Sequence, residues 1–134
     1  MINARDLFIR HATSLFDGDA LAAQSLLLNI TSPVTHRHPA PLGSLSMNIY
    51  STTPKQIGDI LSFLRSVLPA VAFESISIES LNGDRLYPKS DGERLSSGRG
   101  QFVSRTLILI DESKMGEGKL GDRGTSLFMD ETLI

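Results

Sequence analysis

Cysteine is absent from the 134-residue sequence, which excludes disulfide bonds, cysteine-ligated zinc and catalysis by a thiol. Long apolar runs are absent too: the longest, residues 67–73, contains a proline and is far shorter than the roughly 18 residues of a membrane helix. Neither sign of charge dominates, because 13 basic and 15 acidic side chains give a net charge of −2. We therefore expect a soluble chain with no redox chemistry, no membrane binding and no direct strong nucleic-acid binding.

The N-terminal residues carry charges that targeting signals lack. Arg5, Asp6 and Arg10 interrupt any apolar core of a secretory signal, and an acidic residue is unusual in a mitochondrial presequence. The nucleus and the cytoplasm remain as the expected compartments.

The first thirty residues predict two helices. Residues 3–16 place leucine and phenylalanine at helical spacing, with charged residues between them, and Asp17-Gly18 ends the pattern. Residues 19–30 contain mostly good helix formers, and Asp19 stands where it can cap the N-terminus. The apolar face of this second helix is most simply explained by core packing.

A third helix is predicted by the clearest local pattern in the sequence. Thr53-Pro54-Lys55-Gln56 is a capping box with proline at the first helical position, and Pro69 ends the pattern. We expect this helix to pack on a sheet through the face formed by Ile57, Ile60, Leu61 and Leu64.

Three strands are predicted around this helix. Apolar and polar residues alternate over residues 44–49, a short β-branched run covers 73–78, and 106–110 is continuously apolar, as in an interior strand covered on both faces. The order of strand, helix and strand predicts an α/β fold with three layers and a mainly parallel sheet flanked by helices.

We expect a single domain or domain fragment over residues 1–134. Its parts are the N-terminal helices, 1–31; a strand-helix-strand core, 44–112, which contains the loop 82–105; and a glycine-rich loop with a short tail, 113–134. Within the loop, residues 85–88 are a possible short strand. Residues 125–134 are a possible start of another helix.

Asp111-Glu112 is the most suggestive chemical pattern. Nucleoside triphosphatases place such a Walker B pair at the end of a buried strand, where it holds magnesium and polarises water. A helix cap or the start of a solvated loop explains the same pair equally well.

A phosphate loop decides between these alternatives, and the sequence has none. Before the only Gly-Lys pair, Gly118-Lys119, Ser113 stands where the loop needs glycine, and Leu120 follows where it needs serine or threonine. The turn over residues 50–56 contains no glycine, so its backbone cannot wrap phosphates. We therefore predict no catalytic, cofactor-binding or metal-binding residues.

Weaker patterns do not change this prediction. Residues 116–121 match a dinucleotide-binding spacing by letter but have no room for a second strand, so we expect a flexible loop. His36 and His38 lack a third ligand nearby, and Ser96 and Ser97 are not in a nucleophile elbow.

Several segments together resemble the mini-chromosome maintenance complex-binding protein family. The most specific are Leu-Gly-x-x-x-x-Asn-Ile at 42–49 and Asp-Glu-x-x-x-x-x-Gly-x-Leu at 111–120, supported by residues 18–28 and 94–98. Their order and spacing agree with the family over nearly the whole chain.

The resemblance implies a nuclear protein that binds subunits of the minichromosome maintenance replicative helicase. It implies a role in helicase assembly and unloading from chromatin, DNA replication, the cell cycle and sister-chromatid cohesion, without catalysis or cofactor. It also implies a degenerate AAA+ core without a phosphate loop, in which Asp111 and Glu112 are a vestigial Walker B pair. The chain lacks most of the family's C-terminal region, so we expect a fragment.

The resemblance suggests a partner-contact edge consisting of Asp111, Glu112, Gly116, Gly118 and Leu120. The alternative function is a degenerate domain that still binds Mg-nucleotide through Asp111 and Glu112. An α/β domain with no link to the helicase is a third possibility.

Overall fold

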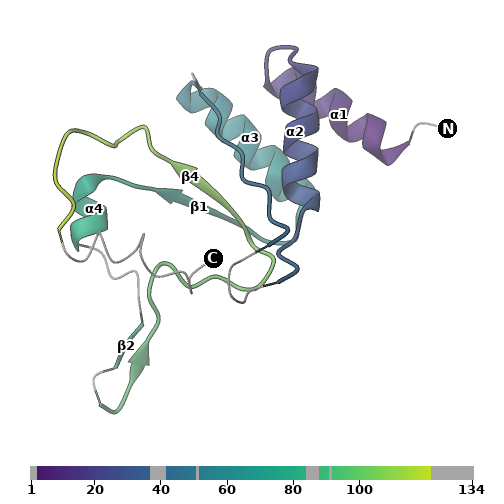
Figure 1. Ribbon diagram of the computed structural model, residues 1–134. Coiled ribbons are helices and arrows are strands. Elements are labelled where there is room, and N and C mark those ends of the chain that lie inside the picture. Colours follow the sequence, from purple (N-terminus) through teal and green to yellow (C-terminus); the bar gives the residue numbers. More distant parts are fainter. Residues whose placement is uncertain (1–2, 37–41, 51, 84–87, 91, 122–134) are drawn as a thin grey trace. The chain divides into compact units, whose positions relative to one another are not determined.

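The computed structural model describes residues 3–36, 42–50, 52–83, 88–90 and 92–121 (Figure 1). The chain divides into two compact units, Met1–Leu68 and Pro69–Ile134. Helices and a small parallel sheet occur together, so the predicted α/β class is confirmed. Among the described residues, no helix is both long and apolar enough to cross a membrane.

The two N-terminal helices form as predicted because each has a local start and stop signal. Helix α1, Ala4–Leu15, begins at Asn3, whose side chain accepts a hydrogen bond from the backbone N–H of Arg5. After α1 the chain reverses through Asp17 and Gly18, which both have positive φ, 51° and 95°. Helix α2, Ala20–Thr31, is capped by the Asp19 carboxylate, which accepts from the first helical N–H groups.

Helix α3, Pro54–Val67, has the predicted capping box. The Gln56 N–H donates to Thr53 Oγ1 at 3.2 Å, and the Thr53 N–H donates to Gln56 Oε1 at 3.0 Å. Its neighbour within the first unit is α1, because Phe63 packs against the Phe8 ring with centroids 5.1 Å apart. The buried side chains of the first unit are Ala12, Ala23, Leu26, Ile60 and Leu64.

The strand predicted over residues 44–49 is wrong. The Leu45 N–H donates to Ser32 Oγ at 3.0 Å, and the Leu45 carbonyl accepts from Asn29 Nδ2 at 2.5 Å. These side chains at the end of α2 bind Leu45, and residues 44–49 pair with no strand among the described residues. The predicted alternation persists only in burial: Met47 and Ile49 are half-buried, whereas their neighbours are exposed.

The second unit contains the parallel pair β1, Val71–Ser75, and β4, Leu107–Asp111. Their register places Val71 opposite Leu107 and Ser75 opposite Asp111. Strand β1 begins earlier than predicted. It also ends earlier, because Ser77 starts helix α4, Ile78–Gly83, by exchanging hydrogen bonds with Ser80. The predicted strand over 106–110 is confirmed as β4.

The prediction that β4 is covered on both faces is wrong. Ile108 and Ile110 are 42% and 53% exposed, whereas the alternate residues are half-buried. The continuous apolar run is therefore a strand with one exposed face. The region predicted as a loop also contains a two-residue hairpin, β2, Lys89–Ser90, and β3, Leu95–Ser96. The possible elements at 85–88 and 125–134 lie almost entirely outside the described residues.

Candidate functional site

Asp111 ends β4 and starts a turn. Its Oδ1 accepts a hydrogen bond from the Ser113 N–H at 3.0 Å, and the Met115 N–H donates to the Glu112 carbonyl at 2.9 Å. The Ser113 N–H and hydroxyl lower the pKa of the Asp111 carboxyl below its ordinary value, and the charge of Lys114 acts in the same direction. The carboxylate is therefore ionised at neutral pH and stabilises the turn, as the simpler sequence interpretation expects.

Gly118 lies against helix α4. A Cβ at this position would be 2.9 Å from Ile78 Cγ2, so only glycine fits without a shift of that side chain. The Asn82 side chain fixes the next residues, because its Nδ2 donates to the Lys119 carbonyl at 3.1 Å and its Oδ1 accepts from the Gly121 N–H at 2.7 Å. Residues 116–121, predicted as a flexible loop, are irregular in structure, but Asn82 of α4 fixes the C-terminal end of this segment.

We name the five predicted contact residues the β4–α4 edge: Asp111, Glu112, Gly116, Gly118 and Leu120. The chain runs from the end of β4 to α4, so the edge is one continuous stretch of the second unit (Figure 1). Glu112 and Gly116 are exposed, and a Cβ on Gly116 would meet nothing within 4 Å. Gly118 lies against Ile78 and Leu120 is half-buried, whereas Glu112 and Gly116 are at the surface.

No phosphate-binding arrangement is present at the start of α3. The capping box uses the N–H groups of Thr53 and Gln56, which a phosphate would otherwise need. Within the described ranges, no group of three or more His, Cys, Asp or Glu side chains could hold a metal ion. His36 pairs with Leu42 in an isolated bridge, and His38 lies outside these ranges.

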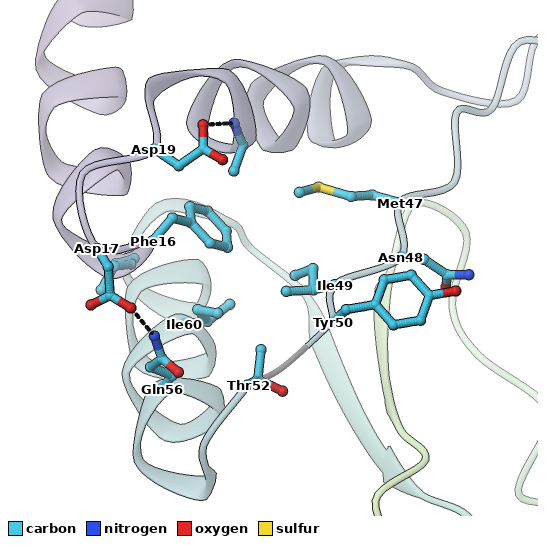
Figure 2. A pocket seen from close by; sticks show the side chains of 12 residues that line it. Phe16, Asp17, Asp19, Met47, Asn48, Ile49, Tyr50, Thr52, Gln56 and Ile60 are labelled. Carbon is cyan, nitrogen blue, oxygen red and sulfur yellow. Dashed lines mark hydrogen bonds between the residues drawn. The ribbon is translucent and has the colours of Figure 1, made fainter.

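Sequence reasoning missed a pocket in the first unit. It has a volume of about 340 Å³ and lies between the end of α1, the start of α2, residues 47–50 and 52, and the first turns of α3 (Figure 2). Met47 and Ile49 point into it, toward Phe16 and Ile60, whereas Asn48 and Tyr50 point away from these two residues. The sequence signal for this pocket was the alternation of apolar and polar residues over 44–49. It reflects apolar side chains that line a pocket and not the buried face of a strand.

The comparisons with known proteins show the family to which the chain belongs. A family described as mini-chromosome maintenance replisome factor matches residues 1–130, and the chain belongs to this family. It is 33% identical over 122 residues to the mini-chromosome maintenance complex-binding protein of Gallus gallus, and 31% identical over 128 residues to that of Salmo salar. The Homo sapiens relative is 32% identical over 123 residues.

These alignments cover 87% of the chain for the chicken protein, 92% for the salmon protein and 87% for the human protein. The chain spans only about a fifth of each relative, 19%, 20% and 18% respectively. No solved structure matches it significantly. The resemblance in the sequence motifs is thereby confirmed at the level of the family.

Proposed function

We propose that this chain is a non-enzymatic binding module for subunits of the minichromosome maintenance replicative helicase. The proposal rests on the family match over residues 1–130, together with relatives that are named as binding proteins of this complex. In this role the protein acts in the nucleus, in helicase assembly and unloading from chromatin, DNA replication and sister-chromatid cohesion. Chromatin is reached indirectly, through the helicase.

We further propose that the β4–α4 edge contacts the helicase. The turn held by Asp111 and the bonds from Asn82 give this surface its shape before a partner arrives. A preformed surface binds with a smaller loss of conformational entropy than a segment that must order on binding.

A degenerate AAA+ origin is part of this proposal. A parallel strand pair, an acidic pair at the end of β4 and a helix that begins where a phosphate loop would lead are consistent with that ancestry. The capped start of α3 and its glycine-free turn are consistent with loss of nucleotide binding.

Replacing Gly116 by glutamate should weaken helicase binding by about ten-fold or more, because the added side chain prevents a partner from packing closely against the surface at this glycine. The fold should tolerate the change, since a Cβ at this exposed position has open space. Gly58→Glu is the matched control, because Gly58 is exposed on α3 and its Cβ would also meet nothing within 4 Å. Biolayer interferometry with the immobilised chain and each purified helicase subunit measures both variants.

The outcomes separate the two parts of the proposal. If no subunit binds the wild-type chain, the proposed function is wrong. If wild type and Gly116→Glu bind with equal affinity, the helicase docks elsewhere and only the assignment to the β4–α4 edge fails.

Isothermal titration of the chain with Mg-ATP should show no binding heat. The turn before α3 has no glycine to wrap phosphates, and the Thr53 and Gln56 N–H groups are already used by the capping box. A micromolar dissociation constant that disappears in Asp111→Asn would instead establish the alternative, a Mg-nucleotide site at Asp111 and Glu112.

A further inference from the structure

Residues 46–50 have unused backbone hydrogen-bonding groups. Leu45, just before them, is bound to Ser32 and Asn29, but none of residues 46–50 makes a hydrogen bond to another described residue. Their side chains alternate as in a strand, with Met47 and Ile49 half-buried and the three others exposed. Such a segment offers a row of N–H and C=O groups to which an extended peptide can add as a neighbouring strand.

The pocket described above lies directly beside this segment (Figure 2). Phe16, Met47, Ile49 and Ile60 give it apolar walls. Its volume of about 340 Å³ is at the small end of the range for ligand pockets, about 300–1,000 Å³, which suits one or two side chains better than a large cofactor. A peptide that pairs with residues 46–50 would bring alternate side chains to this pocket.

The negative charge of the pocket favours an occupant with a basic side chain. Among the described residues that line the pocket, Asp17 and Asp19 are the charged ones. Both are held by neutral donors: Gln56 Nε2 donates to Asp17 Oδ2 at 2.8 Å, and the Leu21 N–H donates to Asp19 Oδ1 at 2.8 Å. Within the described ranges neither carboxylate has a cationic partner, so an arginine or lysine of the occupant would complement them.

Tyr50 adds a contact suited to the same occupant. Its side chain is 84% exposed at the rim of the pocket. Because Tyr50 points away from Phe16 and Ile60, its ring can pack against a β-branched side chain on the other face of the added strand.

We propose that residues 46–50 and this pocket bind an extended peptide segment of a partner protein by strand addition. One apolar side chain of the peptide enters the pocket, and an arginine or lysine two positions away, on the same face of the added strand, faces Asp17 and Asp19. This inference goes beyond the proposed function, because the site is in the first unit and uses no residue of the β4–α4 edge.

The probe is a fluorescein-labelled peptide, Thr-Arg-Val-Leu-Val-Arg-Thr, whose leucine and two arginines share one face when it is extended. It is titrated with the full 134-residue chain and followed by fluorescence anisotropy. A peptide with both arginines replaced by glutamate should bind at least about ten-fold more weakly. Two further peptides carry N-methyl groups on alternate amides. Only one of the two should lose about ten-fold or more in affinity, because successive amides of the peptide point to opposite edges and only one edge pairs with residues 46–50.

A charge-removing variant tests the pocket side of the contact. In the double variant Asp17→Asn/Asp19→Asn, asparagine keeps a good helix cap at position 19 and tolerates the positive φ at position 17. The arginine peptide should bind this variant at least about ten-fold more weakly than it binds the wild-type chain. The control is Asp59→Asn, because Asp59 is an exposed residue of α3 that does not line the pocket. This control should change the affinity for the peptide less than about two-fold. Circular dichroism verifies that both variants fold.

Hydrogen exchange gives an independent measure. The amides of residues 46–50 should exchange quickly in the free chain and become protected when the arginine peptide is added. The proposal is overturned if the peptide fails to bind at about 1 mM, if arginine and glutamate peptides bind equally, or if neither N-methylated peptide loses affinity. Binding that Gly116→Glu leaves unchanged supports a site separate from the helicase edge.

Discussion

Replacing Leu64 by alanine should lower the free energy of unfolding by about 2–5 kcal/mol. Leu64 is 1% exposed on α3, in the core that includes Ala12 and Ala23. Removing three carbon atoms there loses their transfer free energy and leaves a cavity that a close-packed core only partly fills. In a domain of this size, that loss is a large share of total stability. Urea unfolding followed by circular dichroism measures the effect.

Leu61→Ala is the matched control for this prediction. Leu61 is in the same helix but is only half-buried, so the same truncation should cost clearly less. If Leu64→Ala and wild type unfold at the same urea concentration, the described core of the first unit is wrong. Helical periodicity alone places both residues on the apolar face and does not rank them, whereas the structure does.

The three long helices could be predicted because their signals are local. Asn3, Asp19 and the Thr53-Gln56 capping box each satisfy helix N–H groups within three residues of their own position. The reversal after α1 likewise depends on Asp17 and Gly18 themselves. Such features are visible in the sequence because the interacting residues are close together along it.

The strands were harder to predict because a strand requires a partner. Residues 44–49 have the right alternation, but two side chains of the preceding segment, Asn29 and Ser32, bind Leu45 where a neighbouring strand would pair. The run 107–110 is a real strand, yet its apolar sequence gave no sign that Ile108 and Ile110 are exposed. Pairing and coverage depend on residues far away in the chain.

The candidate site likewise has features set by nearby residues, which the sequence predicts, and features set by distant residues, which it does not. The acidic pair and the glycines of the β4–α4 edge could be found in the sequence, but the need for glycine at position 118 depends on Ile78. Likewise, the anchoring of the segment depends on Asn82, 37 residues before Lys119. The pocket beside residues 46–50 combines three helix ends and could not be assembled without coordinates.

Gly43→Ala should destabilise the chain by about 2–5 kcal/mol, from two separate costs. Gly43 has φ of +99°, a left-handed conformation that costs an L-residue about 1–2 kcal/mol. An added Cβ would also lie 2.7 Å from the Pro33 carbonyl oxygen and 2.9 Å from Thr35 Oγ1. Relieving such overpacking typically costs about 1–3 kcal/mol more. This gives a physical reason for the glycine in the Leu-Gly-x-x-x-x-Asn-Ile motif.

Gly18→Ala separates these two costs. Gly18 has nearly the same φ, +95°, but its Cβ would meet nothing within 4 Å, so this variant should show only the conformational cost of about 1–2 kcal/mol. Urea unfolding of both variants gives the difference, which reports the close approach of Gly43 to residues 33–35. Because the Thr35 N–H donates to the Leu42 carbonyl at 2.8 Å, a shift of the chain at Gly43 would break this contact. Equal destabilisation by the two variants would contradict the tight packing at Gly43.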